Sequence, residues 1–263
     1  MSKRKELEAQ RQQQQRKQLI QIAVIIGVIA IVLIGGAIAL NAANPGAGGS
    51  TSTSSVPLPA AIGSTKALPP NIDTTLGMRA WGPANAPIKV EEYLDYQCPA
   101  CGQFAKIYEP GVIEAFASSG KVRYEVQFMP FLEDRASSGQ GRESRDAAQA
   151  AMCAADQGKF WQMHNTLFTN QLITGEENTG NFNKDRLKAM ATTVNGLDTA
   201  AFGTCLDSNK HESEVLKIRA DGEARGVQQT PTFFVNGKSY PGGRTADDFK
   251  KIFAEVAPDV KFP

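Results

Sequence analysis

Residues 88–101 read IKVEEYLDYQCPAC, and this stretch decides the fold. Its first seven residues alternate well enough to predict a β-strand over Ile88–Leu94. After the two cysteines, apolar residues recur at helical spacing as far as Ala115, which predicts a helix that Pro110 kinks or divides. The order strand, Cys-Pro-Ala-Cys, helix therefore places Cys98 at the N-terminus of that helix.

A cysteine in this position is expected to be reactive. Free backbone N–H groups and the positive end of the helix dipole favour the thiolate of Cys98, and Pro99 fits the first turn because no N–H is needed there. Cysteines in such motifs have pKa values lowered to about 3.5–7.5, and Cys101, one turn deeper, is placed to resolve a mixed disulfide. The alternative is a zinc site, which needs two more ligands, but the chain has no second C-x-x-C and its histidines, His164 and His211, are isolated. The spacing favours a redox pair, and we expect no metal and no cofactor, since no Gly-rich phosphate loop joins a strand to a helix.

Glu92 stands out in the predicted strand. Period-2 alternation puts it on the apolar face, together with Ile88, Val90 and Leu94. A carboxyl group there is expected to have a raised pKa and to relay protons to or from a buried Cys101. The alternative is that the end of the strand is wet and Glu92 is simply exposed.

A second strand is predicted near the C-terminus, where residues 226–238 read GVQQTPTFFVNGK. Thr232–Val235 has the composition of a strand, and the Asn-Gly pair that follows is the preferred two-residue hairpin turn. Pro231 opens this strand, which is allowed because the first residue need not donate to the ladder. The chain is then expected to end in a helix over Thr245–Val256.

The N-terminal residues indicate where the protein works. Residues 1–18 carry six basic and two acidic side chains and are expected to form a cytoplasmic head. Residues 19–40 contain no charge, and as a helix of about 33 Å they would span the membrane once as a signal-anchor, leaving the rest of the chain extracytoplasmic. The alternative is a signal peptide cleaved near Ala39, but its apolar region would usually be only about 7–15 residues long. Residues 41–70 are rich in Ala, Gly, Ser, Thr and Pro and are expected to be a flexible, disordered tether.

Charge and cysteine content agree with an exported protein. The net charge is +1, and beyond the basic head the chain is slightly acidic, without a basic patch interleaved with aromatic residues. This argues against nucleic acid as a partner. Four cysteines, an even number, fit an oxidising compartment.

Together these segments resemble the DsbA-like thiol–disulfide oxidoreductases of the thioredoxin superfamily, in particular the membrane-anchored Gram-positive type. The resemblance covers about residues 80–263. It implies an α/β thioredoxin fold with an inserted helical domain. The motifs that carry it are the strand–Cys-Pro-x-Cys–helix unit, TPTFFVNG at 230–237 and AAMCAADQGKFWQMH at 150–164. The implied divisions are an N-terminal thioredoxin segment at 71–132, a helical insertion at 133–226 and a C-terminal thioredoxin segment at 227–263.

The resemblance also implies roles for individual residues. Pro231 would be cis and face the Cys98–Cys101 pair. Thr230 would offer backbone atoms to a bound substrate strand, and Glu92 would be the buried acidic residue near the active site.

The dipeptide between the cysteines, Pro99 and Ala100, would also contact substrate. It departs from the most oxidising members of the family, which have a histidine there that helps to stabilise the reduced thiolate. This departure leaves open how strongly oxidising the protein is.

Cys153 and Cys205 both fall in the predicted insertion. In an oxidising compartment the simplest interpretation is a structural disulfide between two helices, closing a loop of about 50 residues and contributing roughly 4 kcal/mol. The alternative is a second redox pair, which is disfavoured because neither cysteine begins a helix after a strand.

Apolar periodicity predicts the helices of the insertion independently of the resemblance. His164 lies in one of them among large apolar residues and is interpreted as a packed histidine. The segment 174–185 is interpreted as a solvated connector. The periodic stretches are centred on 147–155, 160–172, 187–193 and 215–224.

The predicted activity is the oxidation of exported proteins by dithiol–disulfide exchange at Cys98 and Cys101. The resemblance implies reduced exported proteins as substrates and a quinone-linked membrane reoxidase, of the DsbB or vitamin K epoxide reductase type, as partner. The N-terminal helix would hold the protein at the cell membrane near that partner. The alternatives are a disulfide reductase or isomerase, and a non-catalytic chaperone or peptide-binding module with a thioredoxin fold.

Overall fold

The computed structural model describes residues 79–135, 141–172 and 177–262. The predicted cytoplasmic head, transmembrane helix and tether lie outside these ranges, as do residues 71–78 of the N-terminal thioredoxin segment. Within the described ranges, no helix has the length and apolar character needed to cross a membrane. The membrane anchor at 19–40 therefore stays a prediction.

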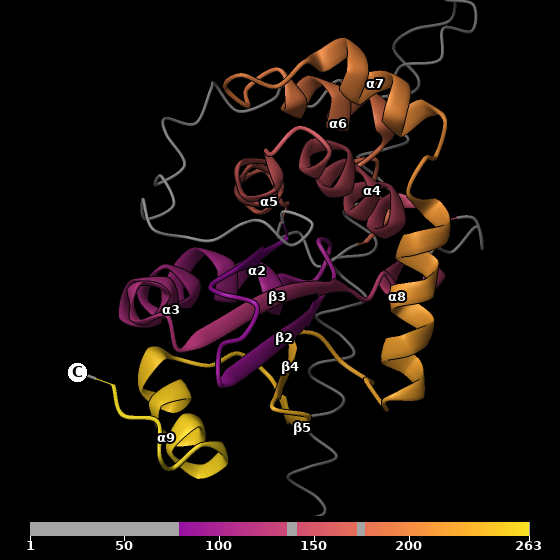
Figure 1. Cartoon of the computed structure of the whole chain (residues 1–263). Helices are drawn as coiled ribbons and strands as arrows, with labels where there is room; N and C mark the ends of the chain where they lie inside the picture. Colours follow the sequence, from indigo (N-terminus) through magenta and orange to yellow (C-terminus); the bar gives the residue numbers. More distant parts are fainter. Residues whose placement is uncertain (1–78, 136–140, 173–176, 263) are drawn as a thin grey trace, which may run out of the picture. The chain divides into compact units, whose positions relative to one another are not determined.

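A five-stranded sheet forms the centre of the thioredoxin fold (Figure 1). Its strands are β1 (Ala80–Trp81), β2 (Ile88–Leu94), β3 (Val122–Phe128), β4 (Thr232–Val235) and β5 (Lys238–Pro241). The strand order is β1-β3-β2-β4-β5, with β2 parallel to β3 and all other neighbours antiparallel. In this register Glu92 of β2 lies between Val126 of β3 and Phe233 of β4. Both strands predicted from the sequence are confirmed with the expected bounds.

The β4–β5 hairpin turns on Asn236 and Gly237, as the sequence predicts. Their φ angles are 47° and 83°, in the left-handed region that Asn and Gly tolerate best. The Asn236 side chain accepts a hydrogen bond from the N–H of Lys89 at 2.8 Å and donates one to the Pro87 carbonyl at 3.2 Å. The turn is thereby tied to the start of β2.

The helix after the cysteine motif is divided, as Pro110 predicts. It consists of α2 (Pro99–Gln103), a π-helical turn η1 (Phe104–Tyr108) and α3 (Glu109–Phe116). The N–H of Glu109 donates to the carbonyl of Phe104, five residues back, and Pro110 follows at the start of α3. Since Pro110 has no N–H to donate, the widened turn accommodates the missing hydrogen bond.

Aromatic side chains attach helices to one face of the sheet. Phe233 of β4 contacts Phe104, with ring centroids 4.9 Å apart, and Phe249, at 5.2 Å. Phe249 belongs to α9 (Ala246–Val256), the C-terminal helix, whose predicted bounds are confirmed to within one residue. The divided helix and α9 therefore cover the face on which Glu92 lies.

The opposite face of the sheet is covered in part by α8 (Glu212–Ala224). Gly222 of α8 packs so closely that a Cβ there would lie 2.7 Å from the Tyr93 ring. Beyond the helix, the guanidinium of Arg225 lies 3.8 Å from the centroid of Phe234 and is paired with Glu91 at 3.0 Å. This helix returns the chain from the insertion to the sheet.

The inserted helices pack around α4, which Figure 1 shows among its neighbours. Nearly every residue of α4 is buried, because its many alanines let other helices approach from several sides. Four of the five helices match the periodic stretches of the sequence; α7 matches none, and only the predicted disulfide between two helices placed Cys205 on a helix. The short helix η2 (Ala117–Ser119) precedes β3, and η3 (Leu132–Arg135) opens the insertion. The helices that follow are α4 (Glu143–Ala155), α5 (Phe160–Thr169), α6 (Lys184–Ala191) and α7 (Thr199–Asp207).

The interpretation of 174–185 as a solvated connector is wrong for its middle, residues 181–182, whereas the other described residues of the segment are exposed or half-buried. Asn181 and Phe182 are buried. The Glu143 carboxylate, at the start of α4, accepts hydrogen bonds from the N–H groups of Gly180 and Phe182 at 2.5 and 2.6 Å. The segment is held because these N–H groups satisfy a carboxylate that would otherwise be buried without partners.

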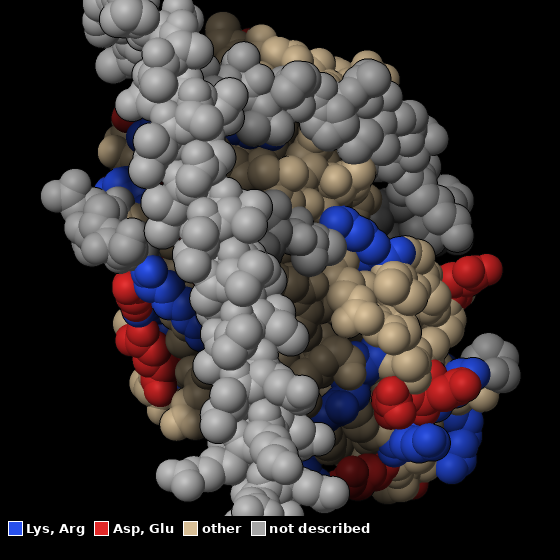
Figure 2. Space-filling view, turned by 180° about the vertical axis from the view of Figure 1, so that it is seen from behind, with Lys and Arg blue, Asp and Glu red and all other residues tan. Residues whose placement is uncertain are grey.

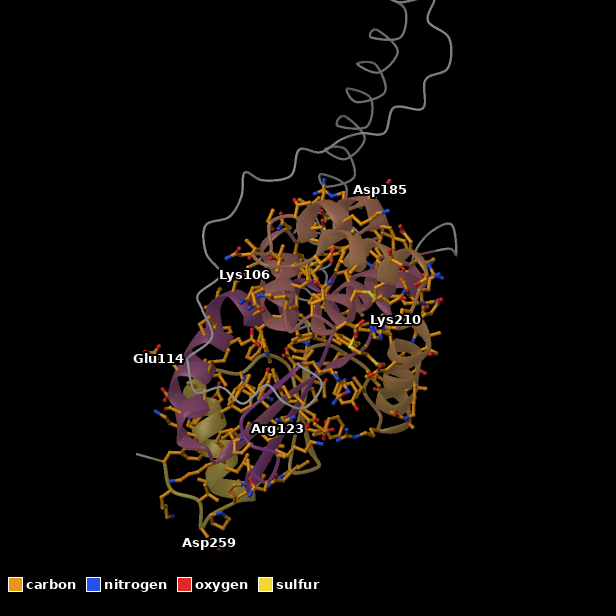
Figure 3. The ribbon with its side chains drawn as sticks, turned by 45° about the horizontal axis from the view of Figure 1, so that its top comes forward. Lys106, Glu114, Arg123, Asp185, Lys210 and Asp259 are labelled. Carbon is orange, nitrogen blue, oxygen red and sulfur yellow. A yellow bond between two sulfur atoms is a disulfide. The ribbon has the colours of Figure 1, made fainter. Side chains whose placement is uncertain are left out.

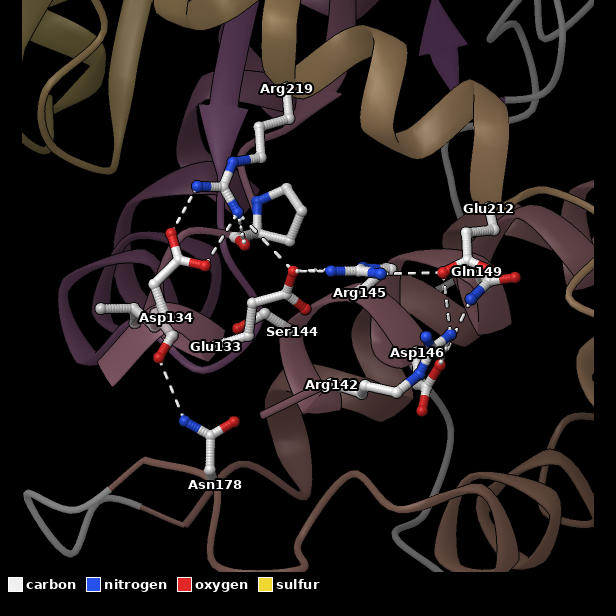
Figure 4. Close-up of polar contacts among 12 residues, drawn as sticks. Glu133, Asp134, Arg142, Ser144, Arg145, Asp146, Gln149, Asn178, Glu212 and Arg219 are labelled. Carbon is white, nitrogen blue, oxygen red and sulfur yellow. Dashed lines mark hydrogen bonds and ion pairs between the residues drawn. The ribbon is translucent and has the colours of Figure 1, made fainter. Parts of the chain in front are cut away.

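Ion pairs join the entry of the insertion to its exit (Figure 4). Glu133 of η3 is buried and lies 2.5 Å from Arg145 of α4, which also reaches Glu212 of α8 at 2.8 Å. Arg219, further along α8 from this contact, pairs with Asp134 of η3. Because a buried carboxylate needs a paired cation, this network fixes where the insertion leaves the sheet.

Charges of both signs share the surface. Figure 2 shows Lys and Arg side chains next to Asp and Glu on the described residues of one face. Among the exposed pairs, Lys217 lies 2.6 Å from Asp221 and Lys188 lies 3.2 Å from Asp207. Such neighbours offset one another, so the electrostatic field around these pairs is weak.

Candidate active site

Cys98 caps α2, as its position after a strand predicts. Its backbone is extended, with φ of −69° and ψ of 118°, and Pro99 is the first residue of the helix. The N–H of Cys98 donates to the carbonyl of Asp95 at 3.0 Å, and its carbonyl accepts from the N–H of Gly102 at 3.1 Å. The first-turn N–H groups of α2 are therefore left free for the Cys98 thiol.

The structure brings the cysteine motif next to the Thr-Pro segment near the C-terminus. The Cys98 sulfur lies 3.3 Å from the Thr230 carbonyl oxygen, across 132 residues of sequence, and donates a hydrogen bond to it when the thiol is protonated. The Thr230–Pro231 peptide is cis, as the resemblance implies. Pro99 and Ala100, between the cysteines, are exposed, so a substrate can reach this side of Cys98.

The two thiols differ strongly in acidity, and neither is in a disulfide. The pKa of Cys98 is lowered to about 6, first by a hydrogen bond from the Cys101 thiol, and then by the Thr230 side chain and the N–H groups of Cys101 and Ala100, against the effect of burial. Burial raises the pKa of the Cys101 thiol well above its ordinary value. At neutral pH the pair is therefore a Cys98 thiolate accepting a hydrogen bond from a Cys101 thiol.

Glu92 is buried on the apolar face, and the alternative that it is exposed is wrong. Burial raises the pKa of its carboxyl group well above the ordinary value, and the negative charge of Glu109 adds to this. Its Oε2 accepts a hydrogen bond from the Tyr124 hydroxyl at 2.7 Å. The predicted burial and raised pKa are confirmed, while the proton relay to Cys101 stays a prediction.

Sequence reasoning missed a second buried carboxyl group, that of Asp95. Its two oxygens accept hydrogen bonds from the N–H groups of Gln97 at 2.9 Å and Leu132 at 3.1 Å. Burial raises the pKa of Asp95 to about 7, and the nearby Cys98 thiolate contributes to this. An acidic residue directly after a buried strand, three residues before the cysteine, was the available signal.

His164 is packed in the core, as predicted, and links the insertion to the helix after the motif. Its Nδ1 lies 3.1 Å from the Tyr96 hydroxyl and its Nε2 lies 3.3 Å from Oε2 of Glu109. All three side chains are buried. This chain of polar groups connects α5 to α3 within the core.

Cys153 and Cys205 form the predicted disulfide between α4 and α7, 52 residues apart in sequence. Figure 3 shows Lys210 near it, and the N–H of that residue donates to the Cys205 carbonyl at 3.2 Å. Among the described residues, these two sulfurs and His211 form the one group placed closely enough to hold a metal ion. Sulfurs in a disulfide are unavailable as thiolate ligands, so this group does not suit a metal.

Comparison with known sequences places the chain among thioredoxin-like proteins. A family model described as thioredoxin matches residues 74–255. The Na(+)/H(+) antiporter NhaA 1 of Salinispora arenicola is 32% identical over 161 residues, which are 61% of this chain and 22% of the antiporter. The chain thus spans about a fifth of the length of the curated relatives that it matches first. Disulfide bond formation protein D of Bacillus subtilis is 27% identical over 177 residues, which are 66% of this chain and 75% of that protein.

Solved structures have the same fold. Oxidised BdbD from Bacillus subtilis superposes with a TM-score of 0.59 and 25% identity, covering 70% of this chain and 95% of that one. DsbA of Chlamydia trachomatis superposes with a TM-score of 0.57 and 18% identity, covering 68% and 90%. The second likeness concerns the fold alone.

Proposed function

Since the chain belongs to the DsbA-like branch of the thioredoxin superfamily, we propose that it is a protein thiol–disulfide oxidoreductase that introduces disulfides into exported proteins. The observation that carries the proposal is the unequal cysteine pair at the N-terminus of α2. Cys98 has a lowered pKa and lies beside the Thr230 carbonyl, whereas Cys101 is a buried thiol.

The first step is attack on the oxidised protein. A substrate thiolate attacks the Cys98 sulfur of the Cys98–Cys101 disulfide, and a mixed disulfide between substrate and Cys98 forms. Cys101 leaves with the bonding electron pair and takes up a proton, because burial strongly favours its neutral form. Glu92, whose carboxyl group has a raised pKa, is the proposed proton donor.

The second step releases the product. A second substrate thiolate attacks the substrate sulfur of the mixed disulfide, and Cys98 leaves as a thiolate. The substrate has then lost two electrons and two protons; the Cys98–Cys101 pair has gained both electrons and one proton, on Cys101, and the other proton has passed to the solvent. A thiol with a pKa of about 6 is a good leaving group at neutral pH, so this step is favoured.

The acidity of Cys98 also supports the proposed direction of electron flow. A stabilised thiolate makes the reduced form more stable, which makes the disulfide a better oxidant. The hydrogen bonds that lower the pKa come from the protein itself, so they act even though the Pro-Ala dipeptide contains no histidine. The lowered pKa of Cys98 is therefore compatible with an oxidase, and the redox state of the pair in cells decides between oxidation and reduction or isomerisation.

The location and the partner belong to the same proposal. The uncharged stretch 19–40, preceded by a basic head, supports a single-pass protein of the cell membrane with its thioredoxin domain outside. The reduced pair needs an electron acceptor for each turnover. A quinone-linked membrane protein of the DsbB or vitamin K epoxide reductase type would supply it, and the anchor would keep the two proteins together.

The test uses the oxidised full-length protein in detergent and a reduced test protein with known disulfides. The wild type is expected to transfer its disulfide, Cys98→Ser is expected to be inactive, and Cys101→Ser is expected to accumulate a mixed disulfide once its Cys98 has been activated by a mixed-disulfide reagent. Replacing both Cys153 and Cys205 with Ala is the matched control and should leave transfer unchanged. If the wild type leaves the test protein as reduced as Cys98→Ser does, the result would instead indicate a non-catalytic binding module.

The direction is tested in intact cells by trapping free thiols with an alkylating reagent. An oxidase is expected to have the Cys98–Cys101 pair mostly oxidised. A mostly reduced pair would contradict the proposal and would support a reductase or isomerase.

A further inference from the structure

One side chain of the helical insertion reaches the active-site backbone. Gln171 follows α5 directly and is buried. Its Nε2 donates to the carbonyl of Tyr96 at 2.9 Å and to the carbonyl of Cys98 at 2.8 Å. A single amide group thus holds the Tyr96–Gln97 and Cys98–Pro99 peptide groups, more than 70 residues away in sequence.

The Cys98 carbonyl has particular importance for the thiol. It belongs to the peptide group that joins Cys98 to Pro99, and because proline has no N–H, this peptide group is held through its carbonyl alone. That carbonyl accepts from the N–H of Gly102 and from Gln171. Its orientation fixes ψ of Cys98, and hence the direction of the thiol relative to the first-turn N–H groups of α2.

The fit around Gln171 indicates that this arrangement is specific. A Cβ at position 102 would lie 1.8 Å from Oε1 of Gln171, so glycine at this position leaves room for the amide group. Oε1 itself is buried and has no hydrogen-bond partner among the described residues. A buried oxygen without a hydrogen-bond partner lowers the free energy of unfolding, so a contribution to stability does not by itself explain a glutamine at position 171. Turning the Gln171 amide by 180° would place Oε1 against the two carbonyl oxygens, and because three acceptors would then face one another, that orientation is excluded.

The neighbouring Gln97 is held differently. Its Nε2 donates to the Ser144 hydroxyl at 2.7 Å, and its Oε1 accepts from the N–H of Asn178 at 2.6 Å. Figure 4 shows Ser144 and Asn178 beside the ion-pair network. These contacts restrain a side chain, whereas Gln171 restrains the backbone of Cys98 directly.

We propose that Gln171 is a positioning residue, which holds the Cys98–Pro99 peptide group so that the Cys98 thiol points at the N-terminus of α2. The proposal rests on the proposed thiol–disulfide chemistry. It assigns the helical insertion a role in setting the reactivity of the redox pair, in addition to any role in binding substrate.

The test titrates the Cys98 thiolate in the reduced full-length protein by its absorbance at 240 nm between pH 4 and pH 9. Gln171→Met keeps the size of the side chain and removes the donor. Without Gln171 the Cys98 thiolate is expected to turn away from the first-turn N–H groups of α2 and to lose one well-aligned hydrogen bond from them. The expected result is a titration midpoint higher by about one pH unit. The rate of Cys98 alkylation at pH 6 should then fall about fivefold, in proportion to the thiolate fraction.

Gly102→Ala provides an independent approach to the same contact. The added methyl group displaces the Gln171 amide, while alanine favours the helix more than glycine does. It should reproduce the upward change in midpoint, and the double variant with Gln171→Met should show no further change, since both act through one contact. Gln162→Met, the same substitution on α5, is the matched control and should titrate like the wild type.

Two outcomes are distinguished. If Gln171→Met and Gly102→Ala unfold cooperatively and titrate like the wild type, the positioning role is wrong and the proposed function is unaffected. If the wild type itself has no thiolate near pH 6 and no disulfide transfer, the proposed function is wrong.

Discussion

The lowered pKa of Cys98 should be visible as a pH-dependent gain in stability. The comparison uses Cys101→Ser, in which Cys98 is the one cysteine of the active site, and the double variant Cys98→Ser with Cys101→Ser. No reductant is needed, so the Cys153–Cys205 disulfide stays intact in both proteins. The hydroxyl of the introduced serine can still donate to Cys98, as the Cys101 thiol does.

The magnitude follows from the two pKa values. Cys98 has a pKa of about 6 in the folded protein against an ordinary value of 9.0. A folded pKa below the unfolded one gives stability that is complete above the unfolded pKa and lost as the pH falls through the folded pKa. The gain is therefore about 4 kcal/mol above pH 9, about 1.4 kcal/mol at pH 7 and close to zero at pH 5.

The assay is urea unfolding, followed by tryptophan fluorescence, of both proteins at pH 5, 7 and 9. The carboxyl group of Asp95 is present in both proteins, but the Cys98 thiolate adds to its raised pKa, so the measured difference includes this coupling between the two groups. At pH 7 the gain corresponds to a redox potential about 30 mV more oxidising than an unperturbed thiol would give. A difference between the two proteins that stays constant or shrinks as the pH rises would refute the reasoning.

Three further substitutions test other regions of the structure. Glu92→Gln should raise the free energy of unfolding, because the buried carboxyl group has a raised pKa and destabilises the folded protein increasingly as the pH rises above the pKa of the unfolded chain. The difference in the free energy of unfolding between variant and wild type should widen by about 1.4 kcal/mol per pH unit; a difference that narrows between urea curves at pH 5 and pH 7 would contradict this. Replacing both Cys153 and Cys205 with Ala should lower the free energy of unfolding by about 4 kcal/mol without slowing disulfide transfer, and a matching loss of transfer would show that this bond takes part in the chemistry. Gly222→Ala should destabilise by about 1–3 kcal/mol, since a Cβ there would lie 2.7 Å from the Tyr93 ring; an unchanged thermal midpoint would show that the helix can shift.

The features that were predictable from sequence are those that local patterns encode. The alternation of Ile88–Leu94, the Asn-Gly pair after Val235 and the position of Pro110 each restrict the backbone within a few residues, and the structure agrees with all three. Cys98 was placed in the same way, because a strand followed by Cys-Pro leaves one position for a helix to begin. Helix α7 carried too little periodicity to be found from pattern alone.

The features that were missed depend on residues far apart in the chain. The position of Asp95 directly after β2 was a local signal, but the hydrogen bond that its carboxyl group accepts from the N–H of Leu132 depends on a residue 37 positions away. Gln171 follows α5, a helix that the apolar pattern predicts, but nothing local indicates that its amide group reaches the Cys98 carbonyl. Likewise, the burial of Phe182 follows from the position of Glu143, which no property of the loop itself reveals.

The contact between Cys98 and Thr230 has a consequence for synthesis, because it joins residues 132 positions apart. A ribosome produces the cysteine motif long before the Thr-Pro segment, and Gln171 emerges between them. The hydrogen bonds from Cys101 and Ala100 that lower the pKa of Cys98 form within the cysteine motif, whereas the contacts with Thr230 and Gln171 need the later segments. The full set of contacts around Cys98 is therefore complete only after almost the entire polypeptide has been made.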